Sequence, residues 1–149
     1  MTEHADPRVA SSQLLAGELR VLIGKLSRRL REQANPGDFT WSQKSVLIRL
    51  EREGPATVTT LARAEGMRPQ SMGATVSTLE QAGLVTGSPD PADGRQTILS
   101  ITPRCRELIR ATRAAKEDWL FHAIQAKLAP QEQDELARAL ALLNRVADQ

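Results

Sequence analysis

The side chains best placed to contact a ligand lie between residues 57 and 85, in the sequence TVTTLARAEGMRPQSMGATVSTLEQAGLV. Apolar residues at Leu61, Ala62, Val76 and Leu79 follow helical spacing, so we expect them to hold two short helices against each other. The polar residues between them then face outward. Because guanidinium, amide and hydroxyl groups bind phosphates and base edges, the binding candidates are Arg68, Gln70, Ser71, Thr75 and Thr78.

These candidates require two helices joined by a tight turn. Thr57 can cap the first helix, and Gly66 stands where a left-handed residue would end it. Pro69 suits the first turn of a second helix that runs to Gly83. The segments LVTGS and QTILSIT, separated by PDPADGR, then predict a β-hairpin. Two helices followed by a hairpin indicate a winged helix-turn-helix, whose second helix enters the major groove of DNA.

Longer helices are predicted on both sides of this segment. Apolar residues recur at three- and four-residue spacing between residues 12 and 34, and a shorter helix follows the candidate cap Thr40 and stops at Gly54. The helical period returns at Pro103, and a last helix follows Pro130. The predicted order is four helices, two strands and two helices, which is a mainly α fold with a small β-hairpin wing.

A single domain over residues 1–149 is expected from the length of the chain. The first helix and the last two each carry an apolar stripe that must be covered. A second copy of the chain would cover these stripes and form a helical dimer base. We therefore predict dimerisation helices at 12–34 and 103–148, a winged helix-turn-helix lobe at 40–102, and a loose arm over residues 1–11.

The composition argues against several other classes of protein. The single Cys105 excludes an internal disulfide, and His4 and His122 are too few for a zinc site. The N-terminal sequence has no export signal and no apolar run approaches a membrane span, so a cytoplasmic protein without membrane contact is expected. Neither a Gly-rich phosphate loop nor a nucleophile with a partnered base is visible, so we expect no enzyme and no cofactor.

The chain resembles a known protein family. The string LARAEGMRPQSMGATVSTLEQAGLV, followed by DGRQTILSIT, is similar to the recognition helix and wing of MarR-family regulators. The resemblance extends over nearly the whole chain, since the flanking helices fall where that family keeps its dimerisation helices. It implies a homodimer that binds double-stranded DNA at a pseudo-palindromic operator.

The resemblance also implies roles for single residues. The family's wing arginine falls on Arg95, which would enter the minor groove or bind its phosphates, while Asp93 steadies the loop. The start of the recognition helix falls on Arg68, Pro69, Gln70 and Ser71. Free N–H groups and the hydroxyl would meet phosphate there, and Gln70 would reach a base.

The sequence departs from the family pattern inside the recognition helix. Members usually carry a Thr-Arg pair where this chain has Gly73 and Ala74, so one expected cation is missing. The segment 41–102 is not net basic, because its lysines and arginines are matched by as many acidic residues. The surplus cations lie in the long helices, where a solvated helix face is the main interpretation and a path for flanking DNA is the alternative.

Cysteine and tryptophan residues leave alternatives open. Cys105 could sense oxidants, but with no partner cysteine an ordinary buried or half-buried thiol is the favoured interpretation. MarR relatives often bind lipophilic or aromatic anions, and a pocket for such an effector could be lined by Trp41, Trp119, Leu22 and Leu26. Core packing is the favoured role for both tryptophans.

The sequence thus predicts a sequence-specific DNA-binding transcriptional regulator. A repressor released by a small lipophilic or aromatic effector is the expected form. The alternative is a winged-helix adaptor that contacts protein without specific DNA binding. A salt-dependent affinity for DNA separates the two.

Overall fold

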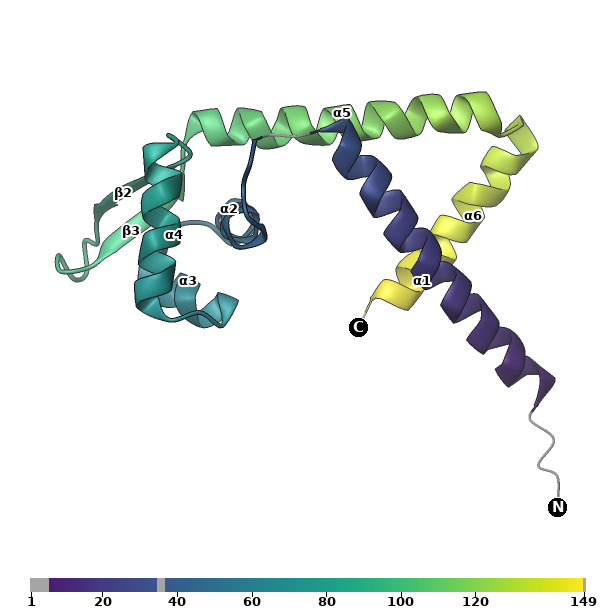
Figure 1. The fold of residues 1–149 in the computed structure, drawn as a ribbon, viewed down its shortest axis with the longest axis horizontal. Coiled ribbons are helices and arrows are strands. Elements are labelled where there is room, and N and C mark those ends of the chain that lie inside the picture. The colour runs from purple at the N-terminus through teal and green to yellow at the C-terminus, as the bar shows by residue number, and fades with distance from the viewer. Residues whose placement is uncertain (1–5, 35–36, 149) are drawn as a thin grey trace, which may run out of the picture. The chain divides into compact units, whose positions relative to one another are not determined.

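Six helices and three short strands make up the chain in a computed structural model, which describes residues 6–34 and 37–148 (Figure 1). The structure divides into two compact units, one formed by Met1–Ala34 with Ala114–Gln149 and the other by Asn35–Arg113. We call the first the helical unit and the second the winged lobe. The mainly α fold with a small sheet confirms the predicted fold class.

The winged lobe contains the predicted helix-turn-helix and hairpin. Its elements are α2 (Trp41–Glu53), β1 (Ala56–Thr57), α3 (Val58–Glu65), α4 (Pro69–Gln81), β2 (Val85–Pro89), β3 (Thr97–Ile101) and the first part of α5 (Pro103–Lys127). The antiparallel sheet has the order β1-β3-β2, with Val85 opposite Ile101 and Ala56 opposite Leu99. The strand β1 was not predicted, because its two residues give no alternating pattern and depend on pairing with β3.

A single apolar core holds the lobe together. Every side chain that is buried among the described residues lies in this lobe, on α2, α3, α4, β2 with the residue before it, β3 and the start of α5. Cys105 is fully buried in this core, which confirms the prediction of an ordinary buried thiol. Burial raises the pKa of the Cys105 thiol, and the negative charge of Glu51 raises it further.

Most of the predicted helix ends are confirmed. Thr40 accepts a hydrogen bond from the Gln43 N–H while the Gln43 side chain accepts one from the Thr40 N–H, which closes a capping box at α2. Thr57 caps α3 by accepting from the Thr60 N–H. Gly66 adopts the left-handed conformation, with φ 64°, that ends α3.

The predicted loose arm is wrong from residue 7 onward. Helix α1 spans Pro7–Gln33, because Asp6 caps it by accepting from the Arg8 N–H and Pro7 occupies its first turn. Residues 1–5, which include His4, lie outside the described residues. The polar sequence before residue 12 lacks apolar periodicity, so only its Asp-Pro start indicated a helix.

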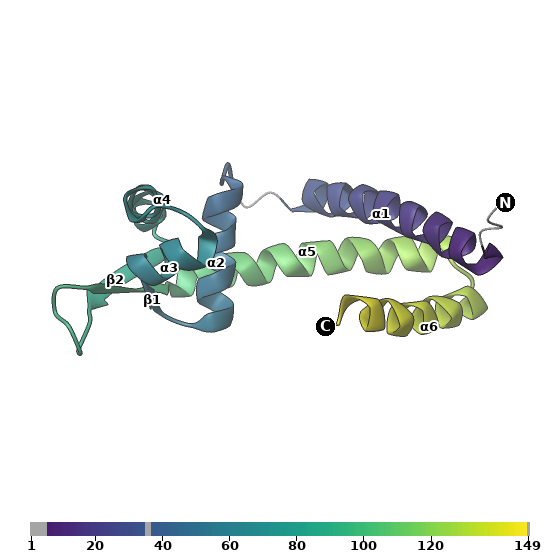
Figure 2. The same ribbon diagram turned by 90° about the horizontal axis from the view of Figure 1, so that it is seen from below.

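The helical unit consists of α1, the second part of α5 and α6 (Pro130–Ala147), and these helices are labelled in Figure 2. Neither α1 nor α6 contains a buried residue. Large apolar side chains are exposed instead, including Leu14, Leu15, Val21, Leu22, Ile23, Phe121, Leu140, Leu142 and Val146. Among its described residues, this unit has no core comparable with that of the winged lobe.

A buried carboxylate fastens α3 to α2. The side chain of Glu65 is only 5% exposed and accepts hydrogen bonds from Arg49 Nε at 2.6 Å and Ser45 Oγ at 2.7 Å. Burial raises the pKa of Glu65, but the hydrogen bonds from Arg49 and Ser45 outweigh it, so the net pKa is lowered. A second pair joins α5 to α2, where Arg113 meets Glu51 through two contacts of 2.7 Å.

Substituting Glu65 tests the link between α2 and α3. We expect Glu65→Ala to lower the free energy of unfolding by about 1 to 3 kcal/mol at neutral pH, because Arg49 and Ser45 lose their acceptor. Since the folded-state pKa of Glu65 is lowered, its contribution is present above the ordinary glutamate pKa of about 4.3. It is lost as the pH falls through the folded-state value.

Urea unfolding across the pH range measures this contribution. The matched control is Glu53→Ala, which removes the more exposed acidic partner of Arg49 and should change stability little. A Glu65→Ala protein as stable as the wild type, or with the same loss of stability in acid, would contradict the assignment.

Candidate nucleic-acid interface

The packing of α4 against the core of the lobe determines which of its side chains point outward. Met72, Val76 and Leu79 are buried in the lobe core and hold one face of the helix. The turn before α4 is closed by the Met67 N–H, which donates to Ala62 O at 2.8 Å. Of the residues predicted to face outward, Arg68, Gln70, Ser71 and Thr78 are exposed and Thr75 is half-buried.

Sequence reasoning missed part of the outward face. Gln70, Ala74, Ser77 and Gln81 are all exposed and follow three- and four-residue spacing on the side opposite the buried residues. Ala74, Ser77 and Gln81 were not among the predicted contacts. The spacing from Gln70 could have identified them, because it is the complement of the apolar pattern.

The N-terminus of α4 has backbone donors available to an anion. Arg68 is the cap residue but makes no side-chain cap, and Pro69 has no N–H. The first N–H bonded within the helix is that of Met72, which donates to Arg68 O at 3.0 Å. The N–H groups of Gln70 and Ser71 precede it, at the positive end of the helix dipole, where phosphates bind.

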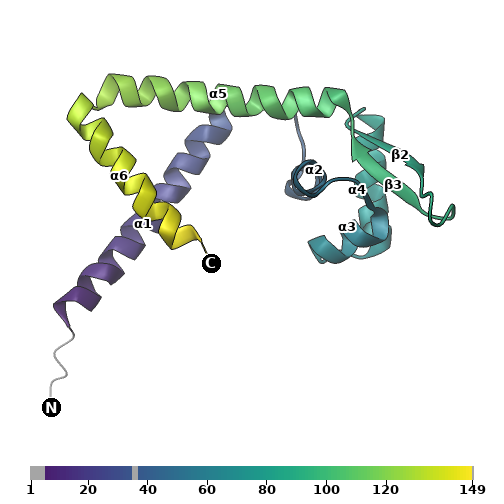
Figure 3. The same ribbon diagram turned by 180° about the vertical axis from the view of Figure 1, so that it is seen from behind.

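The wing holds its arginine outside the body of the lobe. The connection between β2 and β3 projects away from the helices in Figures 1, 2 and 3. It is closed by the Asp90 N–H donating to Gln96 O and the Gln96 N–H donating to Asp93 O, both at 2.9 Å. The Arg95 N–H donates to Asp93 Oδ1 at 3.1 Å, so the structure brings the predicted pair Asp93 and Arg95 together.

The guanidinium of Arg95 is available for binding. Its side chain is 94% exposed, and its Nε lies 3.6 Å from Asp93 Oδ1, beyond hydrogen-bond distance. Some other arginines of the lobe are engaged in ion pairs. Arg49 pairs with Glu65 and Glu53, and Arg110 pairs with Glu107 at 2.6 Å. Arg95 is the only lysine or arginine between Val85 and Ile101, so the positive charge that the wing offers lies at its tip.

The residues proposed for an effector pocket are distributed over both units. Trp41 begins α2 in the winged lobe and is 77% exposed, so its predicted packing role in the core is wrong. Leu22 and Leu26 lie exposed on α1, and Trp119 is half-buried on α5. Their role in binding an effector stays a prediction.

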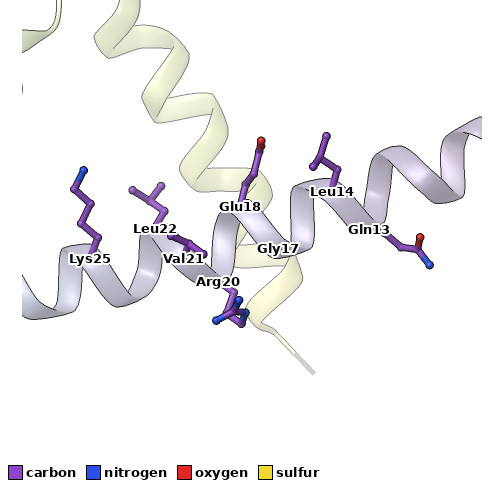
Figure 4. A pocket seen from close by; sticks show the side chains of 8 residues that line it. All are labelled: Gln13, Leu14, Gly17, Glu18, Arg20, Val21, Leu22 and Lys25. Carbon is purple, nitrogen blue, oxygen red and sulfur yellow. The ribbon is translucent and has the colours of Figure 1, made fainter.

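A shallow hollow lies along α1 (Figure 4). Its lining comes from α1 alone and combines apolar and polar residues: Leu14, Gly17, Val21, Leu22, Gln13, Glu18, Arg20 and Lys25. Because one helix supplies every lining residue, the hollow is an uncovered helix face and not an enclosed ligand site.

The described residues contain no cluster of histidine, cysteine and carboxylate side chains able to hold a metal ion. His122 lies 3.4 Å from Asp118 on the exposed surface of α5. Within the same described part of the chain, none of the helices has the length and apolar character needed to cross a bilayer.

Two helices joined by a left-handed glycine turn, with a hairpin directly after the second, define a winged helix-turn-helix protein. The sequence model of the MarR family matches residues 39–97, which cover α2 to the start of β3. A Mycobacterium bovis protein described as an uncharacterized HTH-type transcriptional regulator is 35% identical over 139 residues, covering 93% of this chain and 96% of that protein. The chain therefore belongs to the MarR family of transcriptional regulators.

Solved structures share the fold. A putative transcriptional regulator from Pseudomonas aeruginosa superposes with a TM-score of 0.79 at 35% identity, covering 93% of this chain and 97% of that one. A Staphylococcus aureus MepR mutant, solved bound to an oligodeoxyribonucleotide, matches with a TM-score of 0.69 over 90% of this chain and 98% of its own. Its 17% identity supports a common fold only.

A substitution in β2 tests the packing of the wing. A Cβ added at Gly87 would lie 2.6 Å from Thr97 Cγ2, so the Thr97 methyl group occupies the space that a larger residue at position 87 needs. We expect Gly87→Ala to cost about 1 kcal/mol in the wild-type wing. The same substitution should cost less in a Thr97→Ser background, which lacks the methyl group.

A double-mutant cycle by urea unfolding measures this coupling. The Thr97→Ser variant alone serves as the control and should stay close to the wild type, because Thr97 is exposed. Equal costs of Gly87→Ala in both backgrounds would contradict the close approach.

Proposed function

We propose that this protein is a sequence-specific regulator that binds double-stranded DNA with α4 in the major groove and the wing against the adjacent minor groove. The observation that carries the proposal is the presence, on the same lobe, of an outward polar face on α4 and an exposed arginine at the wing tip. Base edges are read in the major groove, and a cation is attracted by the negative potential of a narrow minor groove.

The predicted contact residues differ in the part of the DNA that their side chains suit. Arg68, Ser71 and the N–H groups at the start of α4 suit backbone phosphates, and Gln70 suits a base edge. Thr75 and Thr78 contribute hydroxyl oxygens and methyl groups from the same helix. Arg95 supplies charge at the wing, with Asp93 holding the backbone that carries it.

We also propose that the functional form is a homodimer joined through α1, α5 and α6. The support is the apolar surface of these helices, since the described residues of α1 and α6 include no fully buried side chain. An interface between identical chains has two-fold symmetry, so two copies of α4 would read the two halves of a pseudo-palindromic operator.

We further propose that the protein represses transcription and that a small lipophilic or aromatic effector relieves this repression. In the helical unit, Leu22 and Leu26 are exposed and Trp119 is half-buried, so they supply apolar surface for such a ligand; in the winged lobe, Trp41 is exposed. The ligand would bind more tightly to a dimer whose lobes are spaced differently from those of the DNA-bound form. It would lower the affinity for DNA by the ratio of its own affinities for the two forms.

Removing the wing arginine tests the DNA-binding mode. We expect Arg95→Ala to weaken binding by a similar factor on every duplex and to reduce the slope of log affinity against log salt by about one. Fluorescence anisotropy over a series of salt concentrations measures both quantities. Arg138→Ala is the control, because it removes the same charge from an exposed position on α6. An unchanged salt slope in Arg95→Ala would refute the wing contact. No salt-dependent binding of DNA by the wild-type protein would favour the alternative, a winged-helix adaptor that contacts protein.

Placing a charge in the proposed dimer interface tests the assembly. We expect Leu140→Glu, alone or with Leu19→Glu, to give monomers and to weaken DNA binding, because each half-site would then be bound independently. Light scattering gives the mass in solution, and anisotropy gives the affinity. Gln131→Glu adds the same charge to an exposed polar position of α6 and should remain dimeric. A monomeric Leu140→Glu protein that retained the wild-type affinity would contradict the dimeric reading of the operator.

A further inference from the structure

The chemistry of α4 restricts which base pairs it can read. Between Pro69 and Gln81 the helix has no lysine or arginine, and its one charged residue is Glu80. The Glu80 carboxylate lies toward the wing, since a Cβ at Gly87 would be 3.9 Å from Glu80 Oε1. The outward face of α4 therefore consists of amide, hydroxyl and methyl groups.

An amide at the start of the helix matches adenine. Gln70 is exposed in the first turn of α4, the part of a recognition helix that contacts base edges. Its carbonyl accepts and its NH₂ donates, which complements the adenine N6 donor and N7 acceptor. Guanine presents two acceptors, which a guanidinium or ammonium group satisfies best, and α4 carries neither.

Two exposed methyl groups lie on α4 about one turn and two turns after Gln70. Ala74 is exposed and offers only its methyl group. Thr78 is also exposed, and its hydroxyl donates to Ala74 O at 3.2 Å, so its proton is used within the helix. What Thr78 presents outward is a methyl group and an acceptor. Apolar side chains of this kind contact the 5-methyl group of thymine.

We propose that α4 reads A·T base pairs, with Gln70 bound to an adenine and with Ala74 and Thr78 packed against thymine methyl groups. The inference rests on the proposed DNA-binding function and specifies the sequence class of its target. Arg68 precedes the helix and contacts phosphate, so it adds affinity without selecting a base.

The experiment begins with selection of bound duplexes from a random pool by the full-length protein. The half-sites obtained should contain A·T pairs at the positions that depend on Gln70, Ala74 and Thr78. Two atomic changes are then made in one half-site of a selected duplex. Uracil in place of thymine removes only the 5-methyl group, and 7-deazaadenine in place of adenine removes only the N7 acceptor.

Uracil at the critical position should weaken binding by about threefold to fourfold, the effect of losing one buried methyl contact. Thr78→Ser should show the same loss on the thymine duplex and no further loss with uracil. Deazaadenine should weaken binding by about fivefold or more. Gln70→Ala should abolish that effect and relax the preference at the same base pair. Thr112→Ser is the matched control, because Thr112 makes the same type of backbone hydrogen bond on α5.

The outcomes separate this inference from the proposed function. A selected operator with G·C pairs opposite α4, or one that binds equally well with uracil at every thymine, overturns the A·T assignment and leaves specific DNA binding intact. A guanine preference that Arg68→Ala removes overturns it in the same way. Failure to enrich any sequence overturns the proposed function and the inference together.

Discussion

The burial of Met72, Val76 and Leu79 in the core of the winged lobe is the constraint on which the rest of the account depends. These three side chains fix the rotation of α4 about its own axis, so they decide which polar groups face outward. A rotation by one residue, about 100°, would bury Thr78 or Ser77 and expose a core residue. The α2–α3 link through Glu65 and the sheet behind α4 then hold the helix in place.

The positively charged side chains of the lobe have two different roles. Glu65 and Glu53 occupy Arg49, and Glu51 holds Arg113, so these cations stabilise the scaffold. The wing instead keeps Arg95 exposed and uses Asp93 chiefly as a backbone acceptor. The segment 41–102, whose positive and negative charges balance, can thus still present a cation where a groove would need it. Such a protein depends more on base contacts and less on non-specific attraction than a strongly basic one.

Much of the fold could be predicted from the sequence because local signals agree with tertiary packing. Thr40, Thr57, Gly66 and Pro69 mark helix ends through backbone chemistry that operates within a few residues. The strand β1 could not be predicted, since it exists only through pairing with β3. The early start of α1 depends on a single cap at Asp6, and the exposure of Trp41 is a tertiary outcome that its residue type does not reveal.

The candidate site was predicted in part for the same reason. Gln70 and Thr78 could be placed outward because Val76 and Leu79 define the inner face, whereas Ser77 and Gln81 were missed although the same periodicity places them there. The ion pairs of Glu65 and Glu51 join residues far apart in sequence, so no local pattern indicates them.

The central claim is that the outward face of α4 and the wing bind specific double-stranded DNA. The most direct measurement is the fluorescence anisotropy of a labelled fragment from upstream of the protein's own gene, titrated with the full-length protein at low and physiological salt against an unrelated competitor duplex. The account predicts tight binding that weakens with salt and resists the competitor. Equal, weak binding to both duplexes would contradict it and would assign the winged helix to a protein partner.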